Sequence, residues 1–281
     1  MKKEAGQILL IVVLVIIIAS TIGLSLASRS ITSLRTSTEE TESQKALAAA
    51  EAGIERAIQG SVPIAIDDNL SNNSSYTTQF TQVQSSSFLI NGGNVIPKDE
   101  GADVWIVSHD SSNNPIYSEA QSIQFLNLYW GTSSYPCESA AIQAIVVSRD
   151  KATGAINSHR YAYDSCPARR AGNNFTLAEN GTFTVTGIPG STFTNRTSPQ
   201  NDLAKNVNDI VFIRVIPIYK DVVVGVSACN YAGSNCTALP TQGYIISSLG
   251  TSGQANRKLS VFKGYPQTYL PYLSYGLFVA N

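Results

Sequence analysis

Four cysteines are the side chains of this 281-residue chain whose spacing most directly implies chemistry, namely oxidation to disulfides. Cys137 and Cys166 flank two segments, residues 142–148 and 155–163, that are rich in apolar and β-branched residues and that we predict to form a β-hairpin. The midpoint between the two cysteines falls in the turn of that hairpin. They would therefore face each other across the bases of its strands.

Cys229 and Cys236 close a short loop that follows another predicted strand, at residues 222–227, and we predict that they form the second disulfide. Four cysteines allow three pairings, and the local one has the best geometry. Two other interpretations remain, free buried thiols or one zinc site made from all four cysteines. Neither cysteine pair has the two-residue spacing of a zinc knuckle, and disulfides are typical of an oxidising compartment.

Side chains suited to acid–base or metal chemistry are few. The chain has two histidines, His109 beside Asp110 and His159 beside Arg160, and neither belongs to a known catalytic motif. Asp67 and its neighbour Asp68 could hold Ca²⁺ together with loop carbonyls, although the pair is more typical of a solvated acidic loop. We therefore predict no enzymatic activity, no bound metal and no cofactor.

Composition restricts the partners. Charged residues make up 14% of the chain and the formal net charge is −1, whereas an average globular domain is about 25% charged. The longest basic run is Arg169-Arg170, so the sequence predicts no nucleic-acid partner. A surface rich in Ser, Thr, Asn and Gln is typical of an exported, β-rich protein.

The hydrophobic residues are concentrated near the N-terminus. No charged residue occurs between Glu4 and Arg29, and residues 8–27 would form a helix about 30 Å long, which matches the core of a bilayer. Two interpretations compete. The segment is either a secretory signal cut after Ala27, or a transmembrane helix that is kept and continues into the residues that follow.

The downstream residues favour the retained helix. Residues 30–58 contain no proline, and Gly60 and Pro63 supply a stop. Gly23 and the Ser/Thr-rich residues 28–38 are its weakest points. We predict a helix over residues 7–59, transmembrane at 8–27 and amphipathic at 30–59. Its apolar packing stripe is predicted at Leu47, Ala50, Ile54 and Ile58.

The N-terminal region resembles type IV prepilins. A short basic leader, residues 1–6, ends in Gly6 and is followed by an apolar helix, and residues 44–57 read QKALAAAEAGIERA, which is similar to a segment of PilX-like minor pilins and pseudopilins. The resemblance covers about residues 1–60, a fifth of the chain. It implies that a prepilin peptidase cuts between Gly6 and Gln7, and that Gln7 becomes the methylated first residue.

The resemblance also implies that the apolar helix packs in the core of a filament. Ile11 stands where most pilins carry a glutamate that pairs with the N-terminal amine of a neighbouring subunit, and isoleucine cannot make that pair. The departure implies a rare subunit at the tip or at the start of a filament. Gln7 likewise replaces the usual aromatic or hydrophobic first residue. The expected assembly residues are Ile8, Ile11, Leu14, Ile18 and Gly23.

Residues 60–281 form the predicted extracytoplasmic domain. Short Val-, Ile-, Tyr- and Phe-rich segments alternate with turn signals, which predicts antiparallel strands and an α+β fold for the whole chain. A polar tract, residues 67–87, reads as a linker or surface loop, and a break between two subdomains is possible near residues 190–206. An aromatic stretch, residues 265–275, is either a recognition surface or a closing segment packed on the domain.

Together these features predict a structural subunit of a type IV pilus or a related filament machine. The apolar helix would span the cytoplasmic membrane once, with Lys2 and Lys3 on the cytoplasmic side and the β domain outside, before transfer into an extracellular or periplasmic filament. The expected partners are other pilin or pseudopilin subunits, the prepilin peptidase and the membrane. Three alternatives are an adhesin displayed by the filament, a secreted enzyme with an ordinary signal peptide, and an anchored protein that never assembles.

Overall fold

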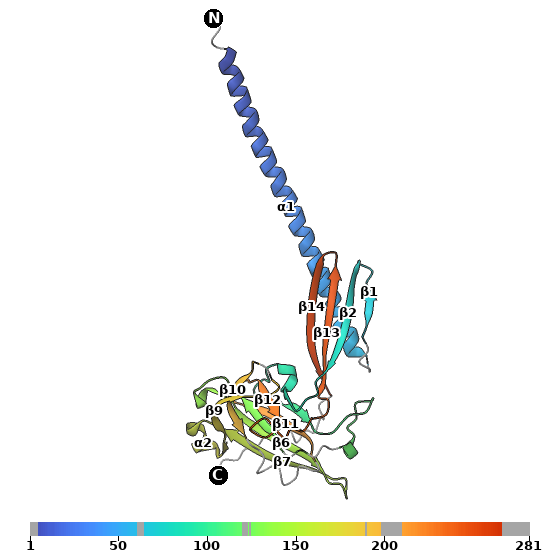
Figure 1. Ribbon diagram of the computed structural model, residues 1–281, viewed down its shortest axis with the longest axis vertical. Coiled ribbons are helices and arrows are strands. Elements are labelled where there is room, and N and C mark those ends of the chain that lie inside the picture. The colour runs from blue at the N-terminus through green and yellow to red at the C-terminus, as the bar shows by residue number, and fades with distance from the viewer. Residues whose placement is uncertain are drawn as a thin grey trace. The chain divides into compact units, whose positions relative to one another are not determined.

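The computed structural model describes residues 5–60, 65–119, 123, 125–188, 190–197 and 210–265. Within them one long N-terminal helix precedes fourteen strands, whose pairing is antiparallel except between β7 and β8, so the predicted α+β fold is confirmed (Figure 1). The chain divides into two compact units. Unit 1 contains the N-terminal helix up to Ala57 with Ala65–Gln79 and Ser247–Leu259, and unit 2 contains Phe80–Ile246 and the described residues from Ser260 onward.

Helix α1 runs from Ala5 to Gln59 without interruption, and its 55 residues correspond to about 80 Å of helix. Gly23 and the Ser/Thr-rich residues 28–38 do not break it. The threonine hydroxyls of this region are satisfied within the helix, because each donates a hydrogen bond to a backbone carbonyl three or four residues earlier. These threonines are Thr21, Thr32, Thr36, Thr38 and Thr41.

The C-terminal part of α1 packs on the sheet of unit 1. The strand order in this sheet is β1 (Asp67–Asn69), β2 (Ser74–Gln82), β13 (Gly243–Ser252) and β14 (Ala255–Gly264). The helix face that it covers consists of small residues, namely Ala46, Ala49, Ala50, Gly53 and Ala57. The alternation of β2 buries Ser74, Tyr76 and Thr78 on its inner side.

The helix and the sheet approach each other closely at two glycines. A Cβ added to Gly250 of β13 would lie 2.0 Å from the carbonyl oxygen of Ala46 and 2.5 Å from the backbone nitrogen of Ala50. A Cβ added to Gly53 of the helix would lie 2.3 Å from Ser248 Oγ and 2.7 Å from Cδ2 of Tyr76. At Gly250 backbone therefore packs on backbone, and at Gly53 the helix backbone packs on the side chains of Ser248 and Tyr76.

This approach corrects the predicted packing stripe of α1. Ala50 is buried and Ile54 is half-buried, but Leu47 and Ile58 are 39% and 44% exposed, so their assignment as packing residues is wrong within this chain. The prediction selected the largest apolar side chains. The sheet instead covers the face with the smallest ones, which is the face that admits a strand at short distance.

The polar tract at residues 67–87 is not a linker. It contributes all of β1 and β2 and the first residue of β3 (Ser87–Leu89). Asp68 of β1 pairs with Tyr76 of β2, and the hydroxyls of Ser75 and Thr251 lie 2.7 Å apart between β2 and β13. The prediction was wrong because the inner face of β2 carries Ser74, Tyr76 and Thr78, whose polar groups hide the alternation that marks a half-buried strand.

Unit 2 contains two five-stranded sheets. One has the order β3, β12 (Val224–Ser227), β5 (Asn127–Trp130), β10 (Thr192–Thr197) and β9 (Glu179–Thr184). The other has the order β4 (Ala102–Trp105), β11 (Ile210–Ile218), β6 (Ala141–Arg149), β7 (Ile156–Asp164) and β8 (Thr176–Leu177). Both contribute to one buried core, which includes Leu128, Trp130, Ile142, Val146 and Ile213.

The predicted hairpin is present in unit 2, since Ile142 of β6 pairs with Tyr163 of β7. Between β7 and β8 the chain forms a short helix, α2 (Pro167–Asn173), and three 3₁₀ turns occur at η1 (Ile90–Gly93), η2 (Tyr117–Glu119) and η3 (Pro136–Glu138). The suggested break near residues 190–206 does not separate the two units, because it begins with strand β10 and both of its described flanks belong to unit 2. The aromatic stretch at residues 265–275 lies outside the described residues apart from Tyr265.

We predict that Gly250→Ala destabilises unit 1 by about 3 kcal/mol, because the new methyl group overlaps backbone atoms of α1 that no side-chain rotation can move. Hydrogen–deuterium exchange of the β13 amides in the full-length protein measures the effect as faster exchange. The matched control is Gly172→Ala in α2, where a Cβ meets no atom within 4 Å and no destabilisation is expected. Unchanged exchange in Gly250→Ala would contradict the close packing.

Candidate functional site

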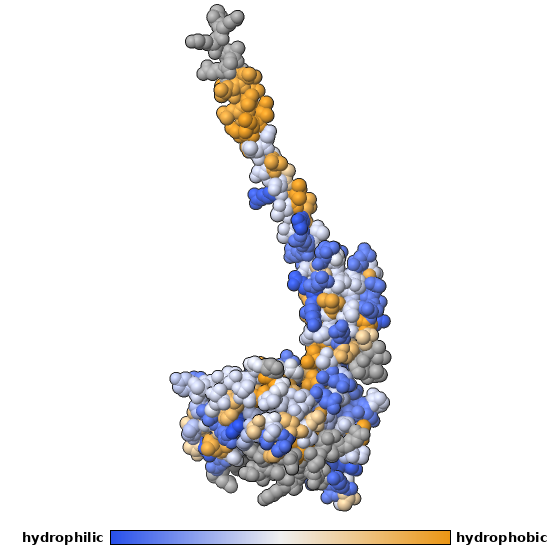
Figure 2. Space-filling model, in the orientation of Figure 1, coloured by the Kyte–Doolittle hydropathy of each residue, from blue (hydrophilic) through white to orange (hydrophobic). Residues whose placement is uncertain are grey.

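The N-terminal half of α1 exposes a continuous apolar surface. Its large side chains from Leu9 to Leu26 are each at least 48% exposed, and Figure 2 shows the strongest hydrophobic colour on the helix surface near its described N-terminal end. The helix is long and apolar enough to cross a membrane, and it is a candidate span by length and composition. The sheet of unit 1, which packs on the C-terminal part of α1, does not cover this surface.

The predicted assembly residues lie on this band. Ile11, Leu14 and Ile18 are 56%, 53% and 50% exposed, and a Cβ added to Gly23 meets no atom within 4 Å. The first turns of α1 also contain Ile8, together with Gly6 and Gln7 of the predicted processing site, and their backbone is helical. The basic leader residues before Ala5 lie outside the described part of the chain.

Polar contacts fix the other end of α1 to the sheet of unit 1. Arg257 Nε of β14 donates to Ser43 Oγ at 2.9 Å, and the hydroxyl of Ser252 donates to the Glu42 carboxylate. Arg56 pairs with Asp68 and also donates to the Tyr76 hydroxyl at 3.2 Å. Because these groups are partly exposed, they contribute orientation more than stability.

The acidic pair Asp67-Asp68 is therefore not an open loop. Both residues belong to strand β1, where Asp68 pairs with Arg56 and Asp67 accepts a hydrogen bond from Thr77. Among the described residues, no group of three or more His, Cys, Asp or Glu side chains could hold a metal ion.

The two disulfides join the cysteines that the spacing favoured. Cys137 in η3 pairs with Cys166 just before α2, with their Cα atoms 4.5 Å apart. Asp164 reinforces this link, because its fully buried carboxylate accepts hydrogen bonds from the Cys166 backbone N–H at 2.9 Å and from Arg169 at 2.7 and 2.9 Å. Arg169 also donates to the carbonyl oxygens of Cys137 and Ser139.

The second disulfide, Cys229–Cys236, closes a seven-residue separation beyond β12. Within its loop the Asn230 carboxamide accepts the backbone N–H of Ser234 at 2.9 Å. Asn127 of β5 donates to the carbonyl of Cys229 at 2.8 Å, which attaches the loop to the sheet. No free cysteine remains in the chain.

His109 lies in an aromatic cluster that the sequence did not predict. Its ring stacks on Tyr265 with centroids 3.7 Å apart and meets Trp105 edge-on at 4.4 Å. Its Nδ1 is buried and has no hydrogen-bond partner among the described residues, so no group orients it as a general base. His159 is exposed on β7.

Burial governs the ionisation of this cluster. It lowers the pKa of His109 to about 4 against the opposing charge of Asp110, and it raises the pKa of Tyr265 to about 12. Both groups are therefore neutral near pH 7. A neutral, stacked pair is suited to packing and to apolar contact rather than to proton transfer at that pH.

Comparison with family models, with curated proteins and with solved structures finds no match for this chain.

The depressed pKa of His109 predicts a pH dependence of stability. Between about pH 6.5 and 4 the unfolded chain binds a proton that the folded chain excludes, so unit 2 loses stability as pH falls through this window. We expect the melting temperature to decrease there, and His109→Phe, which keeps a ring on Tyr265, to flatten the decrease. Calorimetry of the full-length protein measures both, and His159→Gln is the control that should follow the wild type. An equal decrease in His109→Phe and wild type would refute the assignment.

Proposed function

We propose that this chain is a filament subunit of the type IV pilin class, a minor pilin or pseudopilin that occupies a tip or initiating position. The observation that carries the proposal is helix α1. One half exposes an uncharged apolar surface, and the other half is attached to a folded unit by a close backbone contact. A subunit that first resides in a membrane and then packs by the same helix needs both halves.

The continuity of α1 supports a retained helix over a cleaved signal sequence. The residues just beyond Ala27, from Ser28 to Thr41, are exposed throughout and helical throughout. A short, Thr-rich helix without packing partners is marginally stable in water. As part of a helix anchored at both ends, the same segment requires no nucleation of its own.

The charge distribution supports an N-terminus on the cytoplasmic side. Lys2 and Lys3 precede the apolar segment, and all four cysteines follow it. Basic residues are retained inside, and disulfides form in oxidising compartments outside. This topology places both compact units outside the membrane, with the prepilin peptidase and other pilin subunits as partners.

Ile11 supports a position other than the repeating one. With no charged side chain between Glu4 and Arg29, the helix can leave lipid for a protein environment without carrying a carboxylate that must find a partner there. It also offers no carboxylate to the amine of a neighbour. Such a helix fits a filament position that has a neighbouring subunit on one side only.

A second candidate is a binding module displayed by the same anchor. The observation that favours it is a cavity in unit 2 lined by aromatic and polar side chains.

We predict that the mature protein begins at Gln7. Mass spectrometry of the protein purified from membranes should find the chain without residues 1–6 and with a methylated N-terminus. Gly6→Leu should retain the leader, because the prepilin leaders that this N-terminus resembles end in glycine. Ala27→Leu is the matched control, and its mature N-terminus should be that of the wild type.

A mature chain that begins at Ser28 would overturn the proposal and establish an ordinary signal peptide. Retention of residues 1–6 in the wild type would instead favour a plain membrane anchor that never assembles.

A further inference from the structure

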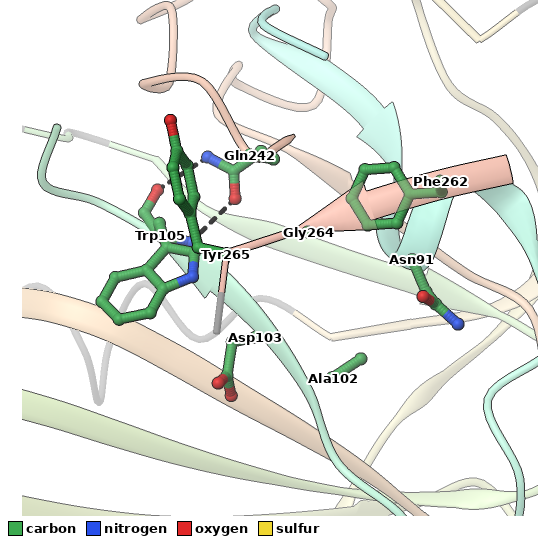
Figure 3. A pocket seen from close by; sticks show the side chains of 8 residues that line it. All are labelled: Asn91, Ala102, Asp103, Trp105, Gln242, Phe262, Gly264 and Tyr265. Carbon is green, nitrogen blue, oxygen red and sulfur yellow. Dashed lines mark hydrogen bonds between the residues drawn. The ribbon is translucent and has the colours of Figure 1, made fainter. Parts of the chain in front are cut away.

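Unit 2 contains a cavity of about 180 Å³ that neither the helix nor the proposed filament role uses (Figure 3). Its walls come from turn η1, strand β4 and the end of β14 with the residue that follows it. Three aromatic side chains, Trp105, Phe262 and Tyr265, line it together with the polar side chains of Asn91 and Asp103.

The aromatic walls are held in place by other residues. The carboxamide of Gln242 accepts the backbone N–H of Trp105 at 2.8 Å and donates to its carbonyl at 2.9 Å, and Tyr265 is fixed by its stack on His109. Gly92, with φ of 64°, lies so close to Phe262 that a Cβ would stand 2.5 Å from the phenylalanine Cβ. The cavity is therefore formed before any ligand arrives.

The polar wall carries no net charge. Asp103 accepts two hydrogen bonds from Arg214, at 2.7 and 2.8 Å, and the two side chains are 4% and 7% exposed. Each oxygen of an ionised carboxylate has two lone-pair sites, so Asp103 retains capacity to accept from a ligand hydroxyl. The carboxamide of Asn91 can both donate and accept.

We propose that this cavity binds one ring of a neutral saccharide. A cavity of about 150 Å³ is known to hold a benzene ring, so the volume here admits the six-membered ring of one sugar, whose outer hydroxyls would extend beyond the cavity. The C–H faces of a sugar ring pack on aromatic faces, whose quadrupole is negative, and its hydroxyls match Asp103 and Asn91.

Other ligand classes fit the walls less well. An anion would approach the Asp103 carboxylate, and the only guanidinium described beside it is already paired with that carboxylate. A purely apolar ligand would offer no hydrogen bond to the Asp103 carboxylate or the Asn91 carboxamide that it covers, and an unsatisfied polar group costs free energy. The proposal does not depend on the filament role, so either can fail alone.

The test is saturation-transfer NMR on the full-length protein in phospholipid nanodiscs, which avoid sugar-based detergents. The probes are glucose, galactose, mannose and N-acetylglucosamine, with glucuronate and glucose 6-phosphate as anionic controls. We expect transfer to at least one neutral sugar and none to the anions.

Two variants remove different parts of the site. Asn91→Gly deletes the carboxamide where φ is 55°, which glycine tolerates, and Gly264→Val adds a side chain beside Phe262. Each should weaken binding at least tenfold. Tyr231→Phe, in the Cys229–Cys236 loop, should bind as the wild type does, and thermal unfolding checks that all variants fold. The proposal is overturned if no neutral sugar gives transfer, if the signal survives both variants, or if an anion binds more tightly.

Discussion

The close approach of the α1 backbone to strand β13 is the contact on which the rest of unit 1 depends. At Gly250 there is no space for a Cβ, and the facing helix residues are small; the strand beside them buries the hydroxyl-bearing side chains of Ser74, Tyr76 and Thr78. Packing of this kind gives little hydrophobic free energy per residue. The interface is defined by shape and by hydrogen bonds such as that between Ser75 and Thr251, while Ser248 Oγ is buried without a partner among the described residues.

The free half of the same helix has the opposite character. Thirteen large apolar side chains from Leu9 to Leu26 are exposed, and burying each from water is worth about 1.5–3 kcal/mol. Their transfer into lipid or protein is therefore worth on the order of 20–40 kcal/mol, which exceeds the 5–15 kcal/mol that typically stabilises a folded domain. The surroundings of this half, and not the stability of unit 1, decide where the protein resides.

The sequence predicted the elements whose signals are local. Helix α1, the β6–β7 hairpin and the two disulfides follow from composition, length and spacing within short segments. Strand β2 was missed because its inner residues Ser74 and Thr78 are polar, and the burial of small hydroxyls becomes intelligible only when the helix face opposite is known to be Ala and Gly. The exposed Leu47 has the same cause, since side-chain size predicts burial only where the partner leaves room for it.

The cavity of unit 2 could not be predicted at all, because its walls come from segments far apart in the chain. In the sequence, Trp105 is one more apolar residue of a short predicted strand, and no neighbouring residue indicates that it lines a cavity. Its position depends on Gln242, 137 residues away, whose carboxamide bonds to the backbone N–H and carbonyl of Trp105 as a neighbouring strand would. Strand β4 lies at the edge of its sheet, so its outer backbone groups have no neighbouring strand to pair with among the described residues. The Gln242 side chain bonds to these groups at Trp105 and at the same time fixes the position of the Trp105 indole. Gln242 thus couples the stability of the sheet edge to the shape of the cavity, a relation that no local pattern contains.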